Sequence, residues 1–321
     1  MLVNNTKTIY KTAVKPGEHK VIELPIGSLP TGTPINILVY VFNSKEPGPT
    51  VLVQGGLHGD EINGVETCKR MLVNDYFKNV KKGCIIVIPL LNVYGFIHFS
   101  RDLPDGKDVN RSFPGSRTGS LAGRIAYYHT NEILPHIDFG IDFHTGGAMR
   151  NNYPQIRYTP NCDLSKQLAN TFNAPIQFES DLINKSFRAT AKKQNVPILV
   201  FEGGESMRFD ELAINEGIRG TLRVLNSQGM IDSYLAITEN TNDTIELKER
   251  KWLRARKGGV FTSNVHNGKR IEKDQVLGYI TDAYGNRSTL IKAPFDGAVL
   301  CVNNHPLVSQ GDAMFHIGKI I

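Results

Sequence analysis

The sequence has 321 residues, 40% of them apolar, with 30 glycines and 16 prolines, which is ordinary for a globular chain of about two domains. A net charge of +6 and a pI near 9.0 suit the steering of an anionic small molecule but do not indicate a nucleic-acid partner. No apolar run approaches the roughly 18 to 20 residues of a membrane span, and the N-terminus lacks the apolar core of a signal peptide.

The four cysteines indicate a reducing compartment. They lie far apart at Cys68, Cys84, Cys162 and Cys301, and none forms a C-x-x-C pair. This spacing suggests neither a disulfide framework nor a cysteine zinc cage. Together with the N-terminus, this cysteine pattern predicts a cytoplasmic protein with no membrane partner. The sequence leaves the oligomeric state open, including a homo-oligomer.

From about residue 35 to residue 230, short apolar runs alternate with longer amphipathic segments. The runs predict strands at 36–43, 50–55, 84–91, 138–144 and 196–203. Helical periodicity predicts helices at 62–75, 120–137, 163–172, 186–195 and 210–228. Strands joined by crossover helices, and apolar along most of their length, indicate an α/β fold with a mixed, largely parallel sheet flanked by helices.

After roughly Ile245 the sequence changes to short strands broken by glycine turns, which predicts a smaller all-β domain. We therefore expect two domains, at 1–245 with an N-terminal extension and at 246–321. The spacing in "APFDGAVLCVNNHPLVSQGDAMFHI" resembles the barrel-sandwich fold of biotinyl and lipoyl carrier domains, but without a lysine in an attachment motif no prosthetic group is expected. The basic run 248–257 is interpreted as a solvated linker.

Polar motifs follow three of the predicted strands. The first gives His58 and Glu61 in "GGLHGDE", a later one gives His144 in "DFHTGG", and another gives Glu202 in "FEGGE". In an open α/β sheet such groups gather beyond the carboxyl ends of the strands. Two histidines and one carboxylate form the usual ligand set of a catalytic zinc, which leaves Glu202 as a general base toward the water that the metal activates.

The glycines Gly55, Gly56 and Gly59 permit the tight or left-handed backbone that lets His58 and Glu61 face one point. The loop 98–116 follows another strand and emerges at the same edge of the sheet. From this loop we expect Arg101 to face the reacting carbonyl, and Asn110 with Arg111 to hold a substrate carboxylate.

The ordered motifs "GGLHGDE", "DVNRSFPG", "DFHTGG" and "LVFEGGE" resemble the succinylglutamate desuccinylase and aspartoacylase family. The resemblance covers about residues 30 to 230 and implies a zinc carboxypeptidase-like fold with one Zn²⁺ per chain. It implies a zinc-dependent amidohydrolase that removes a short acyl group from an N-acyl amino acid or a related small amine, and the expected substrate is a small acylated amine that carries a carboxylate. The implied residues are His58, Glu61 and His144 as metal ligands, Glu202 as base, and Asn110 and Arg111 as carboxylate binders. Arg101 is expected as a catalytic residue at the reacting carbonyl, and Arg188 resembles a substrate-side arginine of the family.

Other interpretations stay open at this point. His58 with Glu61 could be a helix-start pair, His144 a core histidine and Glu202 a structural partner of an arginine. Asn110 and Arg111 could stabilise their own loop, and an amphipathic helix normally exposes an arginine such as Arg188. The rival functions are a metallocarboxypeptidase acting on peptide C-termini and a non-catalytic, metal-binding regulatory protein.

Overall fold

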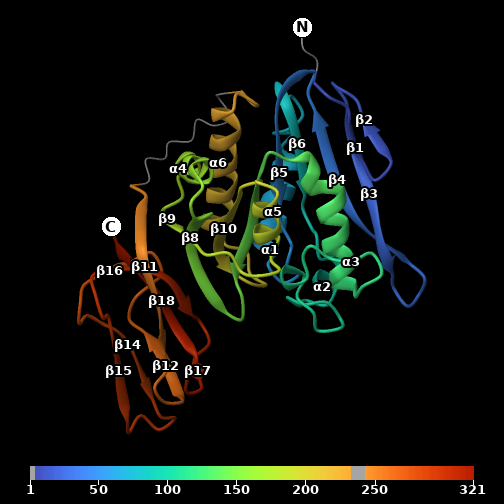
Figure 1. Ribbon diagram of the computed structural model, residues 1–321. Coiled ribbons are helices and arrows are strands. Elements are labelled where there is room, and N and C mark those ends of the chain that lie inside the picture. The colour runs from blue at the N-terminus through green and yellow to red at the C-terminus, as the bar shows by residue number, and fades with distance from the viewer. Residues whose placement is uncertain (1–3, 233–242) are drawn as a thin grey trace.

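The computed structural model describes residues 4–232 and 243–321 and has a mixed α/β fold (Figure 1). Within these residues one sheet of twelve strands extends through the molecule. In spatial order its strands are β13 (Arg270–Ile271), β16 (Gly297–Asn303), β18 (Ala313–Ile320), β11 (Ile245–Arg254), β9 (Ile176–Glu179), β8 (Arg150–Tyr158), β10 (Ile198–Glu205), β7 (Phe139–Gly146), β5 (Glu46–Gln54), β6 (Lys82–Ile88), β4 (Pro34–Asn43) and β3 (His19–Ser28).

The centre of this sheet is parallel. Strands β10, β7, β5 and β6 pair in parallel, whereas β4 and β3 continue the sheet in antiparallel pairing and β8 lies antiparallel to β10. Every residue of β7 is buried, as an apolar central strand requires. The five strands predicted between residues 36 and 203 are confirmed as β4, β5, β6, β7 and β10.

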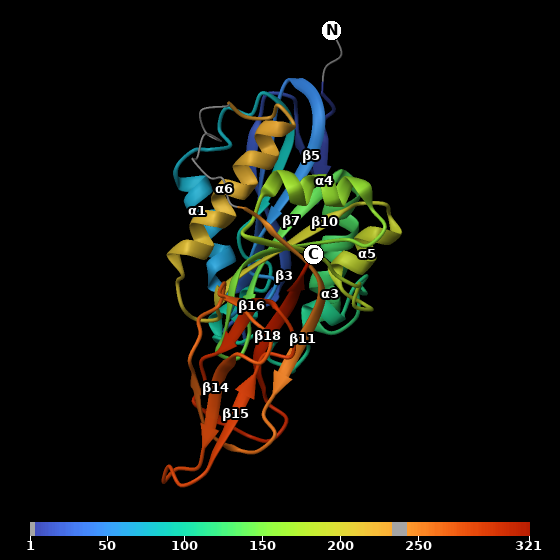
Figure 2. The same ribbon diagram turned by 90° about the vertical axis from the view of Figure 1, so that its left-hand side faces the viewer.

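Helices cover both faces of the sheet (Figure 2). They are α1 (Ile62–Val73), α2 (Val93–Ile97), α3 (Leu121–Tyr128), α4 (Asp163–Phe172), α5 (Phe187–Lys193) and α6 (Glu211–Ser227). Alternate strand residues point to opposite faces. Val51 and Val53 therefore pack with α1, α4 and α6, while Leu52 packs with α3 and α5.

The predicted helix 120–137 is regular only in its first half. After α3 the chain forms a π-helical turn, η2 (His129–Ile133), and a 3₁₀ turn, η3 (Leu134–His136). Pro135 explains the change, because it has no N–H to continue the helical hydrogen bonds. A short 3₁₀ turn, η1 (Val109–Arg111), lies in the loop before α3.

The C-terminal part consists of strands from β11 onward. Besides four strands of the large sheet it holds a second sheet, in the order β15 (Ser288–Lys292), β14 (Val276–Thr281), β12 (Gly259–Ser263) and β17 (Leu307–Val308). Its apolar residues form a separate core that includes Phe261, Leu277 and Phe315. A further two-stranded sheet, β1 (Lys7–Ile9) with β2 (Thr12–Val14), lies near the N-terminus.

The interpretation of 248–257 as a solvated linker was wrong. Most of this run belongs to β11, which pairs with β18 from Leu247 to Arg254. Long basic side chains keep their charged ends in water while the backbone pairs and the stems pack, so a charged composition does not exclude a strand. Trp252 is half-buried in this strand, and the neighbouring Lys251 is exposed.

Two strand pairings join the C-terminal part to the rest of the sheet. β11 pairs in parallel with β9, and β16 pairs with β8 through Cys301 and Asn152. The Asn304 side chain also donates a hydrogen bond to Glu205 over 2.5 Å. In the described residues, no helix combines the length and apolar character needed to cross a membrane.

Candidate metal centre and catalytic pocket

The predicted site residues meet beyond the carboxyl ends of the central strands. His58 lies in the loop after β5, and Glu61 is the N-cap residue directly before α1. His144 lies on β7, and Glu202 is its register partner on the parallel strand β10. Neighbouring register positions of a sheet carry side chains on the same face, so this pairing places Glu202 beside the histidine.

Glycines make the turn before α1 possible. Gly56 has a φ of +61°, in the left-handed region that favours glycine. A Cβ on Gly55 would lie 2.5 Å from the carbonyl carbon of Gly64 in α1, and a Cβ on Gly59 would lie 2.0 Å from that of Gly95. The prediction of a tight, partly left-handed turn is therefore confirmed.

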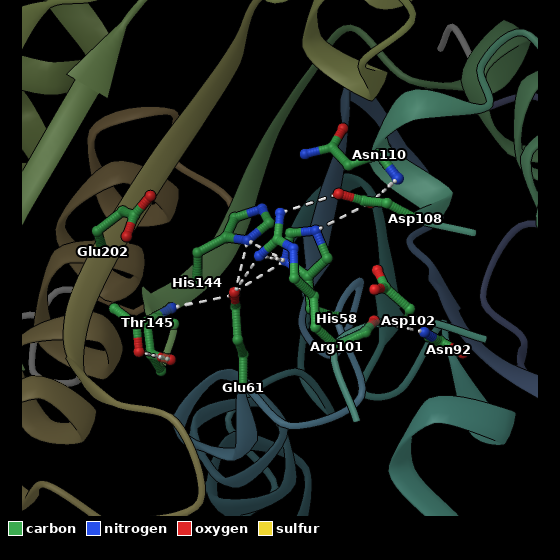
Figure 3. Close-up of polar contacts among 12 residues, drawn as sticks. His58, Glu61, Asn92, Arg101, Asp102, Asp108, Asn110, His144, Thr145 and Glu202 are labelled. Atoms are coloured by element: carbon green, nitrogen blue, oxygen red, sulfur yellow. Dashed lines mark hydrogen bonds and ion pairs between the residues drawn. The ribbon is translucent and has the colours of Figure 1, made fainter. Parts of the chain in front are cut away.

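His58, Glu61 and His144 bring their ligand atoms together, as Figure 3 shows. The His58 Nδ1 atom lies 2.9 Å from Glu61 Oε1 and 3.2 Å from His144 Nδ1, while His144 Nδ1 lies 2.8 Å from Glu61 Oε2. Two ligands about 2.0 to 2.1 Å from a tetrahedral zinc lie about 3.3 Å apart. The donor set and its spacing therefore fit one zinc ion.

Each histidine is oriented by a carboxylate on its outer nitrogen. His58 Nε2 lies 3.2 Å from Asp108 Oδ1, and His144 Nε2 lies 2.9 Å from Asp142 Oδ2. A carboxylate that accepts the Nε2–H leaves the Nδ1 lone pair for a metal. The sequence analysis predicted neither aspartate. Asp142 could have been recognised from the sequence, because it lies two residues before His144 in a strand and therefore on the same face of the sheet.

The charges of the cluster are coupled. Burial opposes the protonated form of both histidines, but Glu61 and Asp108 raise the pKa of His58, and Asp142 with Glu61 raises that of His144 well above its ordinary value. Burial also disfavours the Glu61 carboxylate, yet the two histidines hold its pKa well below the usual range. The site therefore favours an ionised carboxylate facing positive charge.

Arg101 lies at this cluster as well (Figure 3). Its Nη1 is 3.1 Å from Glu61 Oε1 and 3.2 Å from His58 Nδ1, and its Nη2 donates to Asp108 Oδ2 over 3.0 Å. Although burial lowers the pKa of Arg101, these carboxylates outweigh it and raise the pKa. The guanidinium is thus a fixed positive charge beside the ligand atoms.

A pocket of about 270 Å³ opens over the cluster, and Glu202 lines it together with His58, Glu61 and His144. Two side chains of β8 hold the Glu202 carboxylate. Asn152 Nδ2 donates to Oε2 over 2.6 Å, and Arg157 Nη1 lies 3.0 Å from Oε1. The carboxylate is only partly buried, and it faces the pocket without joining the ligand cluster (Figure 3).

The three predicted substrate-side residues also line the pocket. Asn110 Oδ1 accepts a hydrogen bond from the Phe187 N–H over 2.9 Å, and the exposed Arg111 donates to the Asn110 carbonyl over 2.8 Å. Arg188 is 8% exposed and donates to the Ser180 carbonyl over 2.7 Å. Burial and then the nearby Arg157 lower the pKa of Arg188 to about 10.

Further pocket residues come from segments that the sequence did not single out. Arg150, Asn152 and Arg157 belong to β8, and Trp252 belongs to β11. The Trp252 ring stacks on His316 with ring centres 4.3 Å apart, and the Arg150 guanidinium lies 5.9 Å from the Trp252 ring.

Comparison with known proteins identifies relatives along nearly the whole chain. The N-alpha-acetyl-L-2,4-diaminobutyric acid deacetylase of Halomonas elongata is 26% identical over 319 residues, covering 95% of this chain and 92% of that protein. A succinylglutamate desuccinylase/aspartoacylase structure from Rhodobacter sphaeroides has a TM-score of 0.83 at 24% identity and covers 94% of this chain and 95% of its own.

The product-bound structure of the ectoine utilization protein EutE (DoeB) from Ruegeria pomeroyi has a TM-score of 0.84 at 22% identity, covering 98% of this chain and 99% of its own. These structures show a shared fold. The model of the succinylglutamate desuccinylase/aspartoacylase catalytic domain matches residues 47–228, more than half of the chain. This protein therefore belongs to the succinylglutamate desuccinylase/aspartoacylase family.

Proposed function

We propose that this protein is a zinc-dependent amidohydrolase that removes a short acyl group from an N-acyl amino acid or a related small amine. The observation that carries the proposal is the convergence of His58, Glu61 and His144 at ligand distances in a pocket that Glu202 also lines. The deacetylase from Halomonas elongata, by its name, acts on an acylated diamino acid, which supports this reaction class.

The three clustered side chains would hold the zinc in a zinc carboxypeptidase-like layout. When bound, zinc polarises a carbonyl and lowers the pKa of water. Glu202 then acts as general base, taking a proton from the attacking water and delivering it to the departing amine. Asn152 and Arg157 contact the two oxygens of the Glu202 carboxylate and hold it at the pocket.

The arginines of the pocket support a substrate that carries a carboxylate. Arg111 can bind it bidentately, with Asn110 beside it, because Arg111 is exposed and uses one nitrogen on the Asn110 carbonyl. Arg188 supplies a second positive charge at the pocket wall. Arg101 lies beside the ligand atoms, where negative charge develops on the carbonyl oxygen.

The size of the pocket supports a small substrate over a peptide. A volume of about 270 Å³ lies near the lower end of ligand pockets. Trp252 from the C-terminal part contributes to the pocket wall. We therefore favour the deacylase over a carboxypeptidase that accepts long chains.

A substrate screen tests this function. Protein purified without a metal-affinity tag and loaded with zinc is incubated with N-acetyl and N-succinyl amino acids, including N-acetylated diamino acids, and amine release is followed with and without a chelator. We expect release that the chelator abolishes and zinc restores. A parallel reaction contains peptides with free C-termini.

The other outcomes decide between the rivals. Release of C-terminal residues from peptides alone would replace the deacylase with a carboxypeptidase. Zinc binding without turnover of any substrate would favour a regulatory protein, and turnover that resists complete zinc removal would contradict the metal-dependent mechanism.

A further inference from the structure

A buried chain of hydrogen bonds continues behind the metal centre, away from the pocket. From His144 Nε2 it passes to Asp142 Oδ2 over 2.9 Å. The other Asp142 oxygen, Oδ1, accepts from Gln54 Nε2 over 3.1 Å, and Gln54 Oε1 lies 2.6 Å from His129 Nε2. Gln54 is fully buried, and Asp142 and His129 are 2% and 1% exposed.

The chemistry of these groups fixes the direction of every hydrogen bond. The Asp142 carboxylate oxygens accept from Gln54 Nε2–H and from His144 Nε2–H. The Gln54 oxygen is then the acceptor for His129, which must carry its proton on Nε2. Each link therefore determines the next, and the far end requires the Nε2–H form of His129.

The surroundings of His129 hold the ring in this form and orientation. Its ring packs edge to face on Phe187 and Phe113, with ring centres 4.4 and 5.7 Å away. Its Nδ1 is buried and has no hydrogen-bond partner in the described part of the chain, so a second proton there would be unpaired. Burial accordingly lowers the pKa of His129 to about 4, which keeps the ring neutral at physiological pH.

We propose that His129 is a positioning residue of the metal centre, which acts through Gln54 and Asp142 to hold His144 with its Nδ1 lone pair toward the metal. The inference rests on the proposed zinc site. It assigns a role to a histidine in the turn η2, which contributes to neither the pocket nor the ligand set.

Two substitutions of His129 separate the hydrogen bond from the packing of the ring. His129→Phe keeps an aromatic ring between Phe113 and Phe187 but removes the donor to Gln54. His129→Gln removes the ring, while its side-chain amide can reach the position of Nε2 and donate. If the hydrogen bond matters, His129→Phe loses zinc affinity and His129→Gln retains it, and a packing role predicts the reverse.

The readout is zinc affinity, measured by competition with a chromogenic chelator. We expect His129→Phe to bind zinc about tenfold more weakly. This is the lower end of the loss in metal affinity seen when a hydrogen-bond partner of a metal ligand is replaced, because His129 acts through two intervening side chains. His129→Gln should stay close to the unmodified protein. The matched control is Thr130→Val, since the Thr130 hydroxyl is buried beside His129 and has no partner in the described residues.

A spectroscopic measurement reports the tautomer directly. Long-range ¹H–¹⁵N correlation spectra of the zinc-loaded protein should show His129 and His144 each protonated on Nε2. Finding the His129 proton on Nδ1 would overturn the inference. Should His129→Phe fail to fold, Gln54→Met interrupts the same chain and should weaken zinc binding similarly.

The failure of this inference differs from the failure of the proposed function. If the unmodified protein binds no zinc, the metal site itself is refuted. If it binds zinc and His129→Phe binds zinc equally tightly, the metal site stands and the positioning role is wrong.

Discussion

Glu202 is held by side chains of β8 and stays outside the ligand cluster. Its two carboxylate oxygens contact Asn152 and Arg157, so its position does not depend on the metal ligands. The ligands form a separate unit around Glu61. At the scale of single residues, the proposed metal ligands and the proposed base are therefore held by separate sets of contacts.

Replacing Glu202 with glutamine should test this separation. Glu202→Gln keeps the shape of the side chain but cannot take a proton, so we expect a loss in kcat of about a hundred- to ten-thousand-fold with zinc affinity unchanged. Steady-state kinetics and chelator competition measure the two quantities. The control is Glu211→Gln, whose exposed carboxylate pairs with Arg70 and does not line the pocket. Near-normal turnover of Glu202→Gln would contradict its role as base.

The stabilisation by zinc should grow with pH. In the metal-free protein the raised pKa values of His58 and His144 stabilise the fold below the unfolded value of about 6.5, and this contribution is lost as pH rises through the folded values. Glu61, whose pKa is lowered, stays ionised across this window. Zinc needs both Nδ1 atoms deprotonated, so binding strengthens with rising pH.

Thermal unfolding with and without zinc measures this effect. The increase in Tm on adding zinc should be larger at about pH 8 than at about pH 6. An equal or larger increase at the lower pH would show that the histidines do not compete for protons and metal. An Asp or Glu site without histidine would show little change over this interval.

The proposed ligands and the proposed base could be picked out from the sequence because they lie at or just after the ends of apolar strands. His58, His144 and Glu202 each end a run whose composition fixes it as a central strand, and the topology rule then brings the strand ends together. Asp108 and Arg157 lack such a marker. Their positions depend on a loop and on a polar strand, and only the assembled sheet places them beside His58 and Glu202.

At the scale of secondary structure, β11 shows why composition misled. Its basic residues suggested a linker, yet pairing with β18 and β9 makes it a strand. Strand β8 is likewise polar and takes its structure from β10 and β9. In both segments, pairing with neighbouring strands outweighs a weak local preference for strand structure. A single sequence does not reveal this pairing.

Trp252 should make β11 a determinant of substrate size. Removing the indole in Trp252→Ala enlarges the pocket. We therefore expect a higher KM for the preferred short substrate and a relative gain in kcat/KM for substrates with longer acyl or amino chains. The ratio of kcat/KM across a series of acyl chain lengths measures this. Lys251→Ala, at the exposed neighbour, should leave the series unchanged. An unchanged series in Trp252→Ala would exclude Trp252 from substrate selection.

At the scale of the whole molecule, one sheet crosses the predicted domain boundary. Strand β11 begins at Ile245, where the sequence changes character, and it continues the sheet next to β9. The C-terminal part also has a core of its own. The change in composition placed the predicted boundary near residue 245, but the strand pairing across this point depends on residues distant in sequence and could not be predicted.

This continuity predicts cooperative unfolding. Because separation of the two parts would break the β11–β9 and β16–β8 pairings, we expect a single calorimetric transition whose calorimetric and van't Hoff enthalpies agree. Scanning calorimetry of the full chain measures both enthalpies. Two resolved transitions would show that residues 246–321 unfold independently.

The strand pairing of Cys301 with Asn152 has a practical consequence for the design of chimeras between members of this family. Cys301 is fully buried opposite Asn152, and Asn152 in turn donates to Glu202. A chimera that takes its last segment from another member of the family brings a foreign side chain to position 301, one neighbour away from the base. Such a chimera will keep its activity only if the donor sequence supplies a residue there that leaves the amide of Asn152 in place.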